Sequence, residues 1–200
     1  MYFLDDTKYY YSNLAEYQAA ETKYIIKSRE VNPFIYWLYK QKGFEKRILV
    51  YTNHYYPENF KINDVVRWIK EEKNHVRVVT QIPNYPNGEF FNGYGFFLKS
   101  NQRFEKKIIN RLPVIPRGSG TKFLLLLNYL SYFISSFVFT IYLLIFVKKY
   151  DYIIVHHTSP PLISIHPIIY GIFYRTKKIY WELDVWPETL QSLGIIKSNI

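Results

Sequence analysis

The chain has 200 residues, 48% of them hydrophobic and 20% aromatic, a composition that excludes a disordered protein and supports one folded core, with or without an appendage. It has no cysteine, which excludes disulfides, a thiolate nucleophile and cysteine-ligated zinc. The net charge of +10 favours an anionic partner, such as lipid headgroups, phosphorylated substrates or nucleic acid.

Residues 1–45 differ from the rest of the chain. They are rich in Tyr, Lys and Glu, and the first residues carry acids early with no apolar stretch typical of a secretory signal. The sequence predicts a helix up to Ile26, a break at Asn32-Pro33 and a second short helix. We interpret this segment as an N-terminal helical extension, either packed beside the domain or loosely ordered.

The stretch 47–70 predicts a strand, a loop and a helix. A short apolar run ends at Tyr51, and apolar residues recur at helical spacing from Ile62 onward. The loop between them contains no glycine, so the dinucleotide fingerprint GxGxxG is absent. Its His54 and Glu58 follow directly after the strand, where an α/β fold meets its ligands. A loop histidine bonded to neighbouring backbone is the alternative interpretation of His54.

Two further strands are predicted at 76–80 and 106–112. The first is followed by a long loop that contains Asn84, Tyr85, two prolines and several aromatic residues up to Phe97. Such a loop is typical of a lid or a binding surface, although its aromatic side chains are also able to pack on the core. A basic turn, 117–122, leads from the second of these strands to the next feature.

Residues 123–147 form an uncharged apolar stretch. As a helix it measures on the order of 37 Å, which is enough to cross a bilayer. It stands between predicted strands that should share one sheet, so three interpretations compete: a core helix, a helix lying in one leaflet, and a full span. A mildly polar stripe should turn toward protein or substrate, and it consists of Asn128, Ser131, Tyr132, Ser135 and Tyr142. We favour the leaflet, because flanking cations suit an anionic cytoplasmic surface.

The strand predicted at 151–157 ends in His156 and His157, and a helix is expected from Leu162 to Tyr174. Proton transfer or hydrogen bonding to a substrate, a structural role and zinc binding are the alternatives for the two histidines, and no third zinc ligand follows at a suggestive spacing. A last strand at 178–183 leads to Asp184 and Glu188, which are able to bind substrate hydroxyls or to cap the next helix.

These segments together carry a resemblance to a known family. In order they read YYPENFKIND, IPNYPNGEFFNGY, the long apolar helix, HHTSPPL and WELDVWPETLQSLG. Over about residues 46 to 196 this resembles the N-terminal half of glycosyltransferases of family four, in the branch that assembles bacterial capsule, O-antigen and colanic-acid-type polysaccharides.

The resemblance implies a two-domain GT-B enzyme that retains anomeric configuration without a catalytic metal. Its first Rossmann-like domain binds the acceptor, commonly a lipid-linked sugar, and its second binds the nucleotide-sugar donor through paired glutamates. A histidine near the transferred sugar matches His156 or His157, while Asp184 and Glu188 match the D-WPE element. No donor domain follows within the 200 residues.

We therefore expect an α/β domain with a doubly wound, mostly parallel sheet over residues 46–200, the N-terminal half of a GT-B fold. The expected function is the acceptor-binding half of a glycosyltransferase, truncated and inactive alone. The alternative is a membrane-associated subunit that needs a partner chain for the donor domain.

The expected acceptor is lipid-linked or a saccharide. The expected location is cytoplasmic, peripheral to the inner face of the plasma membrane, with no metal, no cofactor other than the donor sugar nucleotide and no nucleic acid. The predicted catalytic residues are His156 and His157. The predicted substrate-binding residues are His54, Tyr56, Glu58, Asn59, Asn84, Tyr85, Asp184 and Glu188.

Overall fold

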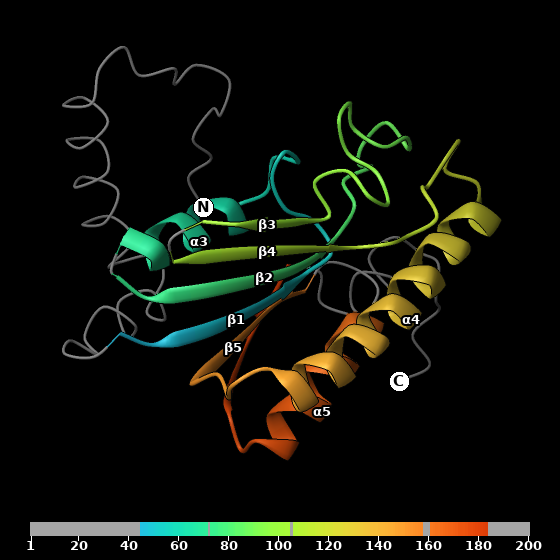
Figure 1. The fold of residues 1–200 in the computed structure, drawn as a ribbon. Coiled ribbons are helices and arrows are strands. Elements are labelled where there is room, and N and C mark those ends of the chain that lie inside the picture. The colour runs from blue at the N-terminus through green and yellow to red at the C-terminus, as the bar shows by residue number, and fades with distance from the viewer. Residues whose placement is uncertain (1–44, 72, 105, 158–160, 184–200) are drawn as a thin grey trace, which may run out of the picture. The chain divides into compact units, whose positions relative to one another are not determined.

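The computed structural model describes residues 45–183 except 72, 105 and 158–160. The N-terminal extension predicted at 1–45 therefore lies almost wholly outside the described residues, as do Asp184 and Glu188. The described part is an α/β domain built on one six-stranded sheet, with helices on both faces (Figure 1).

The sheet is mostly parallel and has the strand order β3-β4-β2-β1-β5-β6. Its strands are β1 (Arg47–Thr52), β2 (His75–Gln81), β3 (Asn101–Arg103), β4 (Lys107–Leu112), β5 (Tyr152–His157) and β6 (Lys177–Glu182). All neighbouring strands pair in parallel except the short β3, which is antiparallel to β4. The five strands predicted from the sequence are confirmed. The sequence analysis missed β3, whose three polar residues show no strand alternation.

The order of the strands reverses between β1 and β5. From β1 the chain runs outward through β2 to β4, and it then returns to place β5 on the other side of β1. In open parallel sheets such a reversal leaves a crevice at the carboxyl ends of the two central strands, where ligands bind. Thr52 of β1 and His156 of β5 are register partners at that point.

Helix α3 (Ile62–Glu71) covers one face of the sheet and buries Ile62, Val65, Val66 and Ile69. The other face carries α4 (Lys122–Phe146), the short 3-10 helix η1 (Pro161–Ser164) and α5 (Ile165–Phe173) (Figure 1). The helix predicted from Leu162 is thus wrong at its start, because its first turn is 3-10 and α-helical hydrogen bonding begins at Ile165. The core on this face includes Tyr132 and Leu143 from α4 together with side chains of β1, β2 and β5.

Helix α4 has its polar side inward. Its buried residues are Asn128, Tyr132, Ser136, Thr140 and Leu143. The Tyr51 hydroxyl and the Thr140 hydroxyl are hydrogen-bonded at 2.7 Å, and Tyr132 donates to the backbone oxygen of Thr52 at 3.1 Å. The predicted inward stripe is therefore right for Asn128 and Tyr132. It is wrong for Tyr142, which is exposed, because the true stripe turns from Thr140 to Leu143.

The outer faces of α4 and α5 are apolar. Leu126, Ile134 and Val138 are 52%, 62% and 61% exposed, and seven more large apolar side chains of α4 are exposed with them. Helix α5 shows the same inversion, since it buries His166, Pro167, Tyr170 and Gly171 while its isoleucines at 165, 168, 169 and 172 and Phe173 face outward. An ordinary surface helix has the opposite pattern.

His166 joins the two inverted helices. Its ring is fully buried, its Nδ1 lies 3.1 Å from the Ser136 hydroxyl, and its centroid is 4.4 Å from that of Phe133. Burial lowers the pKa of His166 to about 4, so the imidazole is neutral in the folded protein at pH 7.

The buried His166 makes the stability of the domain depend on pH. The unfolded chain binds a proton near pH 6.5 and the folded chain only near pH 4, so stability is complete above about pH 6.5 and declines as the pH falls toward 4. The loss should be on the order of 3 kcal/mol. Urea unfolding in detergent at pH 7 and pH 4.5 measures it, and His166→Asn should flatten the profile. An unchanged slope in that variant would show that other groups carry the dependence.

Candidate functional site

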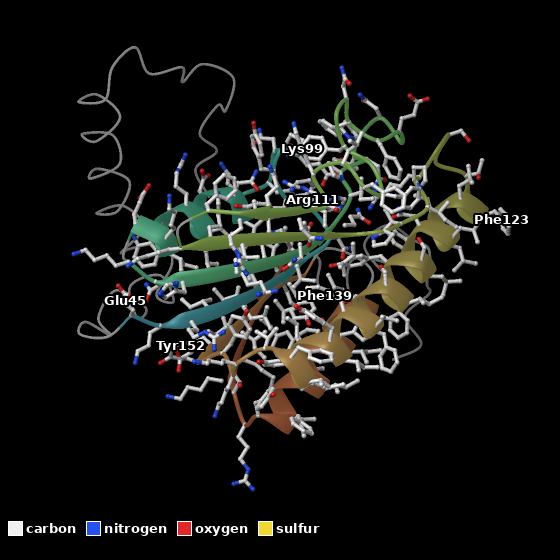
Figure 2. The ribbon with its side chains drawn as sticks, in the orientation of Figure 1. Glu45, Lys99, Arg111, Phe123, Phe139 and Tyr152 are labelled. Atoms are coloured by element: carbon white, nitrogen blue, oxygen red, sulfur yellow. The ribbon has the colours of Figure 1, made fainter. Side chains whose placement is uncertain are left out.

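The candidate site lies at the carboxyl edge of the sheet, at the reversal between β1 and β5. Three loops meet there: residues 53–61 after β1, residues 82–100 after β2 and residues 113–121 after β4. Together these segments are rich in polar and aromatic residues, and each lacks the apolar spacing of a strand or a helix, so each forms a loop. Figure 2 shows Arg111 toward this edge and Glu45 at the opposite end of the sheet.

Glu58 connects the first two loops. Its carboxylate is buried, and one oxygen accepts hydrogen bonds from the backbone N–H groups of Asn84 and Tyr85 at 2.7 and 2.8 Å. The other oxygen lies 2.7 Å from Nδ1 of His54. A buried carboxylate needs such partners, since an unpaired one is strongly disfavoured. Both oxygens of Glu58 are thus engaged by the protein itself.

His54 extends this chain of hydrogen bonds to the third loop. Its Nε2 lies 3.2 Å from a terminal nitrogen of Arg117, and its ring stacks on Phe60 at 4.5 Å between centroids. Arg117 is only a donor, so Nε2 accepts and the proton of the neutral ring is on Nδ1, from which it is donated to Glu58. The ring of His54 is thus held by two side chains, rather than by backbone as the alternative interpretation expected, and its contact with a substrate stays a prediction.

Arg117 has an aromatic environment. Its guanidinium lies 5.3 Å from the centroid of Tyr85 and 5.6 Å from that of Tyr129, distances typical of cation–π contacts. Its backbone N–H points to the Asn84 side chain at 3.4 Å. The sequence analysis treated Arg117 only as part of a basic turn. A lone arginine in a Gly-Ser turn offers no signal of its position.

Glycine is required where the second and third loops touch. Gly88 has φ +81° and accepts a 2.8 Å hydrogen bond from the N–H of Gly118. A Cβ on Gly88 would stand 1.9 Å from the backbone oxygen of Gly118, so no other residue fits without moving a loop.

His156 lies beneath these loops and is completely buried. Its Nδ1 lies 2.9 Å from the hydroxyl of Thr52, which in turn donates to the backbone oxygen of His54 at 2.9 Å. The ring stands edge-on to Trp181, with centroids 4.9 Å apart. The hydrogen bond through Thr52 therefore ties the end of β5 to the first loop. Thr52 was missed by the sequence analysis, since a threonine in a strand carries no functional signal.

The predicted site residues fall into two layers. His54, Glu58, Asn84 and His156 are buried and joined by the contacts above, while Tyr56, Asn59 and Tyr85 are exposed. His157 ends β5, and its side chain lies outside the described residues, as do Asp184 and Glu188. The outer layer offers aromatic rings, an amide and the Arg117 cation, groups that bind sugars and phosphates.

The long loop 82–100 packs on the core at one part and is exposed at another, and its role as a lid or binding surface stays a prediction. Phe90 and Tyr94 pack against the core, while Phe96 and Phe97 are 50% and 95% exposed. Arg111 fixes this part of the chain by donating to the backbone oxygens of Lys99 and Tyr56. Within the described residues there is no group of three or more His, Asp or Glu side chains placed to hold a metal ion.

No family model matches the chain, and no curated protein matches it significantly.

Removing the Glu58 carboxylate should separate the loops. Glu58→Ala leaves two buried N–H groups and His54 without their acceptor, which should cost on the order of 3 kcal/mol of unfolding free energy. Glu58→Gln keeps one acceptor oxygen and should cost less. Glu89→Gln is the matched control in the same region, because Glu89 is exposed and should change stability by less than about 0.5 kcal/mol. Urea unfolding curves measure all three, and equal midpoints for Glu58→Ala and the control would contradict the role assigned to Glu58.

Proposed function

We propose that the chain is the acceptor-binding half of a retaining GT-B glycosyltransferase that builds a bacterial surface polysaccharide. The observation that carries the proposal is the convergence of segments that are distant in sequence and that carry the family resemblance. Glu58 of YYPEN accepts hydrogen bonds from Asn84 and Tyr85 of PNYPNG, and His156 of HHTSPPL contacts Thr52 beside them. Segments that form one site in a family should also meet in this chain.

The topology supports the finer description of the fold. Parallel strands in the order β4-β2-β1-β5-β6, with helices on both faces, suit a Rossmann-like domain with its site at the reversal between β1 and β5. In a GT-B enzyme this edge forms one wall of the cleft, and the donor domain forms the other. We propose that the donor domain is supplied either by further sequence of the same polypeptide or by a partner chain.

The acceptor in this proposal is a lipid-linked sugar, presented at the cytoplasmic surface of the plasma membrane. The support is the apolar outer face of α4 and α5, since α4 is long and apolar enough to cross a membrane and only 22% of its most apolar window is buried. A core helix would be mostly buried. A spanning helix would be unable to lie against the sheet from Asn128 to Leu143, as α4 does. A helix in one leaflet satisfies both observations.

Acceptor binding tests the function directly. The isolated chain should bind undecaprenyl-diphosphate-linked N-acetylglucosamine in detergent more tightly than undecaprenyl phosphate. Tyr85→Leu and Arg117→Gln should each weaken binding about tenfold, because each removes a ring or a cation from the exposed layer. Glu89→Gln should bind as the wild type does.

The same chain should transfer no sugar from any nucleotide sugar, because one wall of a cleft does not hold both reactants in line. Steady turnover by the pure chain would refute the assignment as a half-enzyme. If Tyr85→Leu and Arg117→Gln bind the acceptor as tightly as the wild type does, the assignment of the site is refuted.

The proposed membrane contact is tested by replacing apolar side chains on the outer face of α4 that do not belong to the core. The triple variant Leu126→Gln, Ile134→Gln and Val138→Gln should keep its unfolding free energy, since all three side chains face outward. It should nevertheless shift from the membrane fraction to the soluble fraction. Leu98→Gln, which changes an exposed apolar side chain outside α4 and α5, is the control and should remain with membranes. High salt alone should release the wild type only in part. A wild-type chain found folded in the soluble fraction without detergent would exclude the leaflet position.

A further inference from the structure

A basic cavity of about 460 Å³ lies at the amino end of the sheet, opposite to the candidate site. Its lining includes Arg47, Arg77, Arg103, Lys106, Lys148 and Tyr150. The first two come from the starts of β1 and β2, and Arg103 ends β3, while Lys148 and Tyr150 follow α4. Glu45 and Tyr152, labelled in Figure 2, lie at this end of the sheet.

The charges around the cavity are far from balanced. Glu45 pairs with Lys106 and with His75, and its pKa is lowered mainly by the hydrogen bond from Lys106. By contrast, the described residues provide no carboxylate that forms an ion pair with Arg47, Arg77, Arg103 or Lys148. Four cations therefore converge on a cavity of ligand size.

Arg77 is the most informative of these cations because it is about nine-tenths buried. One terminal nitrogen donates to the side chain of Asn110 at 3.0 Å, but its Nε is buried and has no hydrogen-bond partner in the described structure. A buried guanidinium whose partners, the Asn110 amide and the Tyr150 hydroxyl, are neutral, and which keeps an unused donor, is unfavourable unless an anion completes it. Arg47 is already oriented at the rim, since it donates to the Lys149 backbone oxygen at 2.8 Å and lies 4.7 Å from the Tyr150 ring centroid.

We propose that this cavity binds a phosphate group, with Arg77 as its innermost contact and with Arg103 and Lys148 at its entrance. Guanidinium groups match phosphate oxygens through paired, charge-assisted hydrogen bonds. The volume leaves room for the group that the phosphate carries. This inference does not depend on the proposed sugar transfer, because the cavity and the candidate site lie at opposite ends of the sheet.

Two kinds of molecule carry such a phosphate group, an anionic phospholipid in its headgroup and a small phosphorylated metabolite. Lys148 is two residues beyond the end of α4, whose last residues Ile145 and Phe146 are 66% and 72% exposed. The cavity thus adjoins the end of the apolar face, where headgroup phosphates would lie. Both sources share the same recognition chemistry.

The experiment uses the full chain in two arms. In the first, inorganic diphosphate is titrated into the detergent-solubilised protein by calorimetry. In the second, the protein is floated with vesicles of phosphatidylcholine alone or of phosphatidylcholine with phosphatidylglycerol. Arg77→Gln is the principal variant, and the double variant Arg103→Gln with Lys148→Gln tests the same cavity through two exposed side chains. Lys70→Gln is the control, because Lys70 is an exposed cation on α3.

The expected result is wild-type binding of diphosphate, of phosphatidylglycerol vesicles or of both, weakened at least about tenfold in Arg77→Gln and in the double variant. Lys70→Gln should bind as the wild type does, and vesicles of phosphatidylcholine alone should not distinguish the proteins. A metabolite site responds in the first arm, and a headgroup site responds only in the second. Absence of binding in both arms overturns the proposal, as does an equal loss in Lys70→Gln.

Discussion

The buried carboxylate of Glu58 is the interaction on which the candidate site depends. Parallel strands bring their carboxyl ends to one edge, but they do not fix the loops that follow. Glu58 does so by accepting two backbone N–H groups from the second loop and bonding His54, which in turn reaches Arg117 of the third. The exposed Tyr85 and the half-buried Arg117 are therefore held in place by the buried Glu58 and His54 behind them.

A second constraint shapes the opposite side of the domain. In α4 and α5 most of the buried side chains are polar or small, with Leu143 as the one large aliphatic exception, and most of the large apolar side chains face outward. In water the reverse arrangement would be more stable. Full burial of a leucine or isoleucine side chain contributes roughly 1.5 to 3 kcal/mol, and an exposed side chain lacks much of this contribution. The inward hydroxyls of Ser136 and Thr140 are satisfied by His166 and Tyr51. The leaflet position that we propose would place the outer apolar side chains in hydrocarbon and leave the inner polar ones against the domain.

Much of the fold was predictable from the sequence, because β1, β2, β4, β5 and β6 each contain a short group of apolar or aromatic residues, and turn residues and helically spaced apolar residues separate these groups. The hairpin strand β3 was not, since Asn101, Gln102 and Arg103 carry no hydrophobic signal and are held to β4 by backbone pairing and by polar side-chain hydrogen bonds from Asn110 and Arg111. Within the site, Glu58 and His54 were predictable as polar residues at a strand end. Their bonding to Arg117 was not, because loop conformation brings together residues 63 positions apart.

The two ends of the sheet are linked by α4. This helix starts at its N-cap Thr121, four residues after Arg117 of the candidate site, and ends just before Lys148 of the basic cavity. If its apolar face lies in one leaflet, both ends are at headgroup depth, because an in-plane helix keeps a constant depth along its length. The Arg117 cation and the cavity cations then face the same layer of phosphates at positions on the order of 37 Å apart. A spanning helix would place them on opposite surfaces, although β4 and β5, which flank α4, belong to one sheet. In the proposed leaflet arrangement, the single sheet therefore requires that both sites approach the membrane from the same side.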